Sequence, residues 1–169
     1  MCCVAVTADK CTDADLDRPD ATTIYRSPSN ATEAVLLRPD CTFERVPISR
    51  DQEKLTDASR TLNFTGMGAE QVVSYPSTVN TFVLDRNAVH EANFSTAMDL
   101  RFLILRRSQL TNVDKFIMPP SLFTLDLRGN AMHSLNGSKL PDTTYSIIIS
   151  ENKLQNLDNF IFPRSLRQL

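Results

Sequence analysis

The sequence predicts an α/β solenoid, with short parallel strands on a concave sheet, short helical or irregular segments on the convex side, and a loop-rich amino-terminal cap. Two observations predict it. An eleven-residue pattern, L-x-x-L-x-L-x-x-N-x-L, recurs from residue 79 onward at a period of 21 and then 22 residues. A proline three residues before the pattern recurs with it, at Pro76, Pro119, Pro141 and Pro163, although the unit beginning at Leu100 lacks it. Two marks that recur in phase indicate a stack of similar units.

We number the positions of the pattern one to eleven, so that its apolar residues occupy positions one, four, six and eleven. Alternation over a short segment is typical of a strand with one buried face, and we expect these side chains to point into a core. A single unit cannot bury enough apolar surface to fold alone, so the units must stack. Positions one, four, six, nine and eleven are filled by Val79, Phe82, Leu84, Asn87 and Val89; by Leu100, Leu103, Leu105, Ser108 and Leu110; by Leu122, Leu125, Leu127, Asn130 and Met132; and by Thr144, Ile147, Ile149, Asn152 and Leu154.

Position nine is the turn position, and it holds Asn87, Ser108, Asn130 and Asn152. An asparagine amide donates and accepts hydrogen bonds at once, and therefore satisfies the backbone of a tight turn. A serine hydroxyl does only part of this, so the sequence predicts a looser turn at Ser108.

A second set of apolar residues follows position eleven. Its spacing predicts a single helical turn or a 3₁₀ segment on the convex side of each unit. The recurring proline would end that segment and direct the chain into the next strand. The set consists of Val113, Phe116, Leu135, Leu140, Leu157, Phe160 and Phe162.

The sequence divides at about residue 55. The repeats are expected at 55–169, as a degenerate opening unit at 55–75, four full repeats at 76–165 and a truncated fifth. Residues 1–54 carry no repeat, and two short apolar runs at 22–25 and 34–37 are candidate strands. We expect this segment to be a leader and a cap, because the first unit of a solenoid has an apolar edge that must be covered. A mostly disordered leader is the alternative.

The amino terminus bears on the compartment. Residues 1–8 fit either the tail of a signal peptide, with Val6 and Ala8 at the −3 and −1 positions of a cleavage site, or an ordinary polar terminus. Cleavage after Ala8 would leave two of the four cysteines, Cys11 and Cys41, and we expect these to form a disulfide. A free-thiol cytosolic protein is the alternative.

Composition and motifs bound the function. The formal net charge of −2 gives no general attraction to nucleic acid or acidic membranes. The apolar runs are far shorter than the roughly 20 residues of a spanning helix, so no membrane span is expected. The sequence holds no phosphate-binding loop, nucleophile elbow or zinc-protease motif, which predicts no enzyme activity, no cofactor and no small-molecule substrate. It also has no C-x-x-C pair, so no metal site is expected.

From about Leu55 onward the chain resembles the leucine-rich-repeat superfamily. The starts at Pro119-Pro120-Ser121-Leu122 and Pro163-Arg164-Ser165-Leu166 make it similar to the extracellular repeats, of roughly 22 residues each, of oomycete proteins, including receptor-like kinases. The resemblance implies a parallel sheet on the inside of a curved solenoid, with a protein partner on the concave face. The sequence departs from that family in showing no kinase domain, no membrane span and no carboxyl-terminal cap.

Four sequons agree with an extracellular protein or an ectodomain. They begin at Asn30, Asn63, Asn93 and Asn136, and each is a candidate glycosylation site. None falls within the strands of the four full repeats, where a glycan would obstruct the concave sheet.

Positions two, three, five, seven and eight of each unit are expected to face solvent on the concave side. Large apolar side chains there have no core to fill, and aromatic residues beside arginines are typical of binding hot spots. Ordinary packing between neighbouring strands is the alternative explanation. The predicted partner-binding residues are Arg101, Phe102, Ile104, Arg106, Arg107, Phe123, Asp126, Arg128, Tyr145 and Ile148.

These observations predict a non-catalytic, protein-binding leucine-rich-repeat module that is secreted or part of an ectodomain and prefers an acidic partner. One alternative is the amino-terminal ectodomain fragment of a receptor-like protein kinase, whose catalysis would lie outside this chain. Another is a solenoid that binds single-stranded nucleic acid, because aromatic residues with arginine also suit that ligand.

Overall fold

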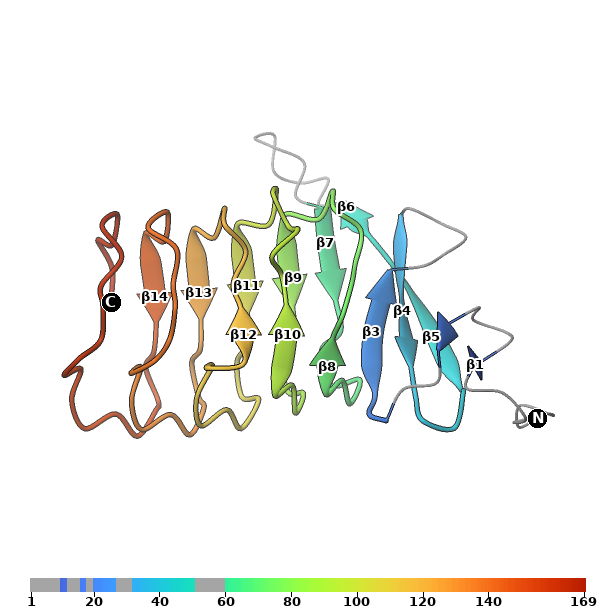
Figure 1. Ribbon diagram of the computed structural model, residues 1–169, viewed down its shortest axis with the longest axis horizontal. Helices are drawn as coiled ribbons and strands as arrows, with labels where there is room; N and C mark the ends of the chain where they lie inside the picture. The colour runs from blue at the N-terminus through green and yellow to red at the C-terminus, as the bar shows by residue number, and fades with distance from the viewer. Residues whose placement is uncertain (1–9, 12–15, 18–19, 27–31, 51–59) are drawn as a thin grey trace.

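The structure is a computed structural model, and it describes residues 10–11, 16–17, 20–26, 32–50 and 60–169. Figure 1 shows an elongated stack in which the chain advances from one end to the other, turn by turn. Each turn adds one parallel strand to a six-stranded sheet, and the early turns also add a strand to a second six-stranded sheet. The predicted solenoid of parallel strands is thereby confirmed.

The first sheet, which we call the repeat sheet, is built from the strands of the recurring pattern. Its strands are β6 (Ser49–Arg50), β7 (Arg60–Asn63), β9 (Thr81–Val83), β11 (Phe102–Ile104), β13 (Thr124–Asp126) and β14 (Ser146–Ile148). Neighbours pair in parallel, except that β6 and β7 are antiparallel. The register aligns Leu62, Phe82, Leu103, Leu125 and Ile147. Position four therefore repeats in space as it does in the sequence.

The second sheet, which we call the back sheet, joins the amino-terminal segment to the repeats. Its strands are β3 (Thr23–Arg26), β4 (Glu33–Leu37), β5 (Phe43–Pro47), β8 (Gln71–Val72), β10 (Glu91–Asn93) and β12 (Phe116–Ile117). The strands β3, β4 and β5 are antiparallel, and β3 then pairs in parallel with β8 of the first turn. A separate antiparallel pair consists of β1 (Lys10–Cys11) and β2 (Leu16–Asp17).

The sequence predicted helical or irregular segments on the convex side, and the structure places no helix in the residues it describes, so the helical form and the α/β class do not hold. The corresponding segments form β8, β10 and β12 in the early turns and irregular turns later. A helix is costly to nucleate, and each segment lasts only a few residues before the next strand begins. Asn93 and Asn112 also accept the amide two residues further on, a local bond that competes with a helix. The fold is an all-β solenoid.

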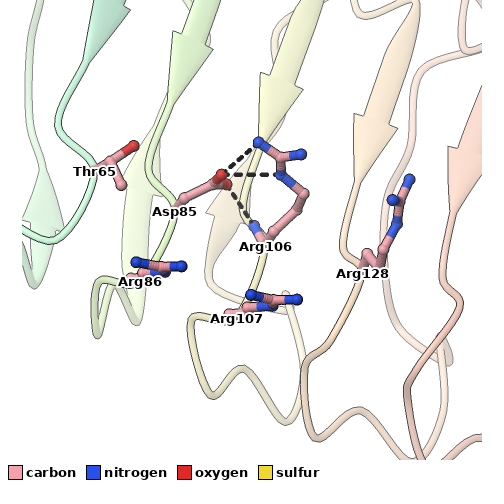
Figure 2. Close-up of a pocket in the computed structure, with 6 residues that line it drawn as sticks. All are labelled: Thr65, Asp85, Arg86, Arg106, Arg107 and Arg128. Carbon is pink, nitrogen blue, oxygen red and sulfur yellow. Dashed lines mark hydrogen bonds and ion pairs between the residues drawn. The ribbon is translucent and has the colours of Figure 1, made fainter.

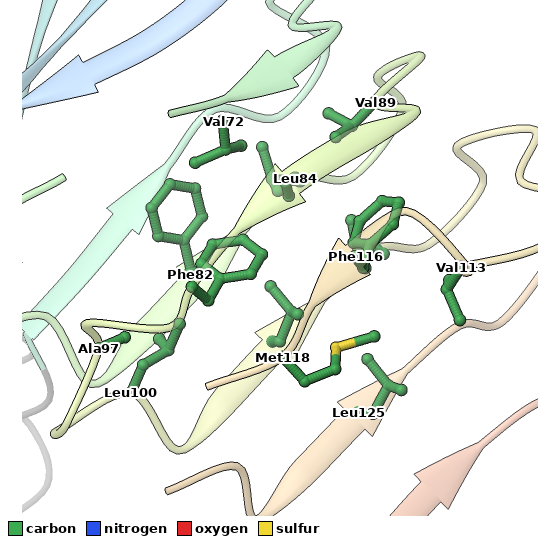
Figure 3. Packing of buried hydrophobic residues seen from close by; sticks show 14 of the residues in the cluster. Val72, Phe82, Leu84, Val89, Ala97, Leu100, Val113, Phe116, Met118 and Leu125 are labelled. Atoms are coloured by element: carbon green, nitrogen blue, oxygen red, sulfur yellow. The ribbon is translucent and has the colours of Figure 1, made fainter. Parts of the chain in front are cut away.

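The core contains side chains from both sheets and runs through the stack (Figure 3). Phe82 is stacked on Phe64 with ring centroids 5.6 Å apart, and it meets Tyr75 edge-on at 5.0 Å. Positions one, four, six and eleven are buried in the first three repeats and less completely in the fourth. The convex apolar set mostly joins this core, but Phe162 is 48% exposed and does not.

The amino-terminal segment covers the first turn with strands, including the two that the sequence predicted, and is less rich in loops than expected. The apolar runs at 22–25 and 34–37 correspond to β3 and β4. Ile24, Leu36 and Val46 belong to the same hydrophobic core as the repeats. The apolar edge of the first turn is therefore covered by a sheet that continues from turn to turn.

Cys41 is buried at a turn with a φ of 64° and is disulfide-bonded. The side chains of Cys2, Cys3 and Cys11 lie outside the described residues, so the pairing of Cys11 with Cys41 stays a prediction. The proposed signal-peptide remnant at 1–8 also lies outside them.

Asparagine at position nine ties adjacent turns together. The Nδ2 of Asn130 donates to the carbonyl oxygens of Leu105 and Leu127, each at 2.8 Å. Its Oδ1 accepts the amides of Ser108 and Leu110 at 2.9 and 3.1 Å. The asparagine therefore satisfies its own turn and also the turn before it, which extends the role that the sequence suggested.

Ser108 reproduces only the donor half of this arrangement. Its hydroxyl lies 3.0 Å from the Leu84 carbonyl oxygen and 3.1 Å from that of Arg106, and it has one proton to share between them. The backbone amide of Ala69 donates to Oδ1 of Asn87. The equivalent amide one turn later belongs to Val89, and among the hydrogen bonds of the described residues none joins it to Ser108. One backbone donor thus lacks the acceptor that asparagine supplies elsewhere.

Candidate functional site

The predicted partner-binding residues all lie in β11, β13 and β14 or within three residues of those strands. Positions three, five and seven point away from the core, because they alternate with buried positions four and six. The residues fall into three lines that cross the repeat sheet: one at the amino ends of the strands, one in the middle and one at the carboxyl ends.

The line at the amino ends, which we call the aromatic row, consists of Phe102, Phe123 and Tyr145. Phe123 stacks on Tyr145 with a centroid distance of 5.0 Å and an interplanar angle of 4°, and it meets Phe102 edge-on at 6.3 Å. The guanidinium carbon of Arg101 lies 5.0 Å from the centroid of the Phe123 ring. Phe102 and Tyr145 are 37% and 36% exposed, so apolar ring surface faces solvent. Pairs of this kind contribute about 0.5–1.5 kcal/mol each, so the row also stabilises the sheet.

The middle line is not continuously apolar. The register places Asp126 between Ile104 and Ile148. Asp126 is only 7% exposed, and its Oδ1 accepts the backbone amide of Arg128 at 3.1 Å. Its Oδ2 lies 3.7 Å from the Arg128 guanidinium. Little of Asp126 is thus available to a partner, and its clearest contacts are within the sheet.

The line at the carboxyl ends forms a pocket of about 420 Å³, which we call the arginine pocket (Figure 2). Successive turns contribute to it in order, mostly through positions seven and eight of the pattern. Its lining residues are Thr65, Asp85, Arg86, Arg106, Arg107 and Arg128. Arg106, Arg107 and Arg128, predicted as partner-binding residues, are therefore brought together by the fold.

One ion pair organises the pocket. Nε and a terminal nitrogen of Arg106 approach Oδ2 of Asp85 at 2.9 and 2.6 Å, and the Arg106 backbone amide donates to Oδ1 at 2.9 Å. The hydrogen bond to Asp85 raises the pKa of the Arg106 guanidinium, and the charges of Asp85 and Asp126 add to this while partial burial opposes it. Arg106 is therefore firmly charged and held in place.

Position eight has a left-handed backbone in every unit. It is occupied by Gly66, Arg86, Arg107, Gly129 and Glu151, with φ values of 69°, 56°, 54°, 70° and 59°. Glycine adopts this conformation freely, whereas other L-residues do so at a cost of roughly 1–2 kcal/mol. A Cβ on Gly129 would lie 3.0 Å from Cγ of Arg107, so this glycine leaves room for the neighbouring arginine.

Sequence reasoning did not select Thr65, Asp85 or Arg86, which complete the pocket. A signal for Arg86 was present, because it occupies position eight, as the predicted Arg107 does in the next unit. The signal for Asp85 was weaker, since only the spatial register shows that it faces Arg106 of the next turn.

Three of the four sequons lie in described residues. Asn63 and Asn93 end β7 and β10, and both are exposed, as is Asn136. Asn30 lies outside the described residues. Exposure permits a glycan without demonstrating one, so glycosylation stays a prediction.

The described ranges contain no cluster of three or more histidine, cysteine, aspartate or glutamate side chains placed to hold a metal ion. Across the same residues, no helix with the length and apolar character of a membrane span is found. No family model matches the chain, and comparisons with curated proteins and with solved structures gave no match either. The resemblance to leucine-rich repeats thus rests on the sequence pattern, and the structure shows the coarser feature, a solenoid of parallel strands.

Proposed function

We propose that this chain is a non-catalytic, protein-binding module of the leucine-rich-repeat type, acting outside the cell or as part of an ectodomain. It recognises a protein partner, with a preference for an acidic one, on the face of the repeat sheet that points away from the core, which the sequence predicts to be concave. The observation that carries the proposal is the aromatic row, flanked on the same face by the arginine pocket.

The row supports a protein partner for a physical reason. Exposed aromatic rings that lie side by side, with a guanidinium over one of them, present apolar area at little cost in side-chain entropy. The rings hold each other in place, so a partner would meet a pre-ordered surface. Arginines rather than lysines line the neighbouring pocket, and this favours fixed contacts with carboxylates or similar anions over a diffuse positive field.

The test uses partners isolated from extracellular proteins of the source organism, with affinities then measured on purified pairs. Phe123→Ala combined with Tyr145→Ala should weaken binding by at least tenfold, because both substitutions remove hot-spot ring surface. The control is Phe162→Ala, which removes an exposed ring that lies outside the repeat sheet. Equal affinity in the double variant and in the control would refute the proposed binding face.

Single-stranded nucleic acid is the second candidate, because the face combines aromatic rings with arginines. The geometry offers it less support: Phe123 and Tyr145 are stacked on each other, so the ring faces between them are not open to a base. Tight binding of a generic oligonucleotide that weakens steeply with salt would favour this candidate.

A further inference from the structure

We infer that the arginine pocket binds a phosphate or sulfate ester carried by the protein partner. The inference rests on the proposed function, because it names the chemistry that the partner presents beside the aromatic row. Phe123 and Tyr145 occupy position two, and position seven lies five residues further along the unit, or about 17 Å along an extended strand. One short segment of a partner can therefore reach both the row and the pocket.

The pocket has more positive charge than its carboxylates neutralise. Four arginines and one aspartate line it. The aspartate pairs with Arg106, and Asp126, which lies outside the lining, is 3.7 Å from Arg128. Arg86 and Arg107 form no ion pair with any residue that the structure describes. Two exposed guanidinium groups thus face the pocket without a carboxylate of their own.

The donors that remain suit an oxyanion with three terminal oxygens. Guanidinium groups present planar, paired N–H donors that match phosphate and carboxylate geometry. The Arg128 side chain is 42% exposed and its guanidinium lies 3.7 Å from Asp126, beyond hydrogen-bond distance, so a third arginine also has donors to spare. A carboxylate offers two oxygens to these three arginines, whereas a phosphate or sulfate ester offers three.

The size of the pocket favours an ester over a free ion. Its volume of about 420 Å³ is more than ten times the roughly 30 Å³ that one water molecule occupies in the liquid. A small tetrahedral ion would leave most of this space to solvent. An oxyanion attached to a side chain, such as that of tyrosine, fills it better.

The backbone at Arg86 and Arg107 adds to the argument, and Glu151 at the same position shares their conformation. Position eight requires a left-handed conformation, and Gly66 and Gly129 supply it without strain in the units on either side. Arg86 and Arg107 adopt it against their intrinsic preference, with φ values of 56° and 54°. Residues held in this region tend to occur where function retains them. Glycine would serve the turn equally well, so the arginine side chains need a reason beyond the fold, and anion binding provides one.

The first experiment measures the affinity of the full chain for inorganic phosphate and for inorganic sulfate at constant ionic strength, with chloride as the reference anion. Both oxyanions should bind in competition with each other. The variant Arg86→Gly with Arg107→Gly should lose at least tenfold in affinity and stay folded, because glycine stands at the same turn position in the flanking units. Glu151→Gly is the matched control, since it makes the same backbone change at a residue that does not line the pocket and, by removing a negative charge, should not weaken the affinity.

The second experiment uses three acidic peptides that differ only at a central tyrosine, which is unmodified, phosphorylated or sulfated. The modified peptides should bind the natural chain at least tenfold more tightly than the unmodified one, and the double glycine variant should abolish that advantage. Whichever ester binds more tightly identifies the source of the anion. The inference is overturned if the three peptides bind equally, if the advantage survives the double substitution, or if a single-stranded oligonucleotide outcompetes the modified peptides in the pocket.

The two proposals can fail separately. If the modified peptides depend on Arg86 and Arg107 while partner binding ignores Phe123 and Tyr145, the pocket stands and the proposed binding face does not. If partner binding depends on the rings while phosphate, sulfate and both esters bind the double glycine variant unchanged, only the pocket inference is lost.

Discussion

Positions eight and nine are consecutive residues in each turn of the stack, yet the structure constrains them differently. At position nine, Asn87 and Asn130 are 4% and 7% exposed, and their side chains bond to the backbones of two turns. At position eight, Arg86 and Arg107 are exposed, and the turn depends on their left-handed backbone. The fold specifies position nine through its side chain and position eight through its backbone alone.

The residues that fill these positions follow from this difference. Position nine holds asparagine or serine in every full repeat, because few side chains supply the donors that the neighbouring carbonyl groups need. Position eight holds glycine, arginine or glutamate. Because the fold accepts such different side chains at position eight, a binding function can determine which residue occurs there. In two turns that residue is arginine.

The largest effect is expected at position nine. Asn130→Ala would leave the carbonyl oxygen of Leu105 and the backbone amides of Ser108 and Leu110 without their partners, whereas the Leu127 carbonyl oxygen keeps its bond from Asn152. At about 1–3 kcal/mol for each buried group left unsatisfied, we expect a loss of at least about 3 kcal/mol in the free energy of unfolding, measured by urea denaturation. The exposed Asn136→Ala is the control and should change stability by less than about 0.5 kcal/mol. If both variants lost a similar free energy of unfolding, the Asn130 side chain would not be what ties the two turns together.

A smaller effect, of opposite sign, is expected at Ser108. Asparagine there would keep the bond to the Leu84 carbonyl and would add an acceptor for the Val89 amide. One added hydrogen bond contributes about 0.5–1.5 kcal/mol, so Ser108→Asn should stabilise the chain by about 1 kcal/mol. In the natural chain, hydrogen exchange at the Val89 amide should be faster than at the Ala69 amide, because the Ala69 amide donates a hydrogen bond to Asn87. Equal protection of the two amides would show that the serine turn is no looser than its neighbours.

The repeat itself was predictable from the sequence, for a physical reason. A strand with one buried face must alternate apolar residues, and a stack of such strands must repeat them at one period. The pattern therefore predicted the register of Leu103, Leu125 and Ile147, which the structure places side by side in adjacent strands. The tie between turns at Asn130 was only partly predictable, because its bonds to Leu105 and Ser108 join residues about one period apart.

The convex side and the pocket were not predictable in the same way. Apolar residues three to five apart fit a helical turn and a buried irregular segment alike, and the short segment between Phe116 and Pro119 is decided by pairing with the previous turn. The arginine pocket depends on which side chains meet across turns, as Arg106 and Asp85 do. A linear pattern shows that a residue is free of the core without showing what it contacts.

The smallest effect on stability is expected at position eight. Its size tests whether the fold constrains only the backbone there, in contrast to position nine. Glycine would relieve a left-handed strain of roughly 1–2 kcal/mol and would lose roughly 0.5–1 kcal/mol through the greater freedom of the unfolded chain. Arg107→Gly and Glu151→Gly should therefore each change the free energy of unfolding by between about 0 and 1.5 kcal/mol, in the stabilising direction. Thermal and urea denaturation of the two variants provide the measurement. If Arg107→Gly destabilised the chain by more than about 1 kcal/mol while Glu151→Gly did not, the Arg107 side chain would be part of the fold, and its left-handed backbone would no longer point to a binding role.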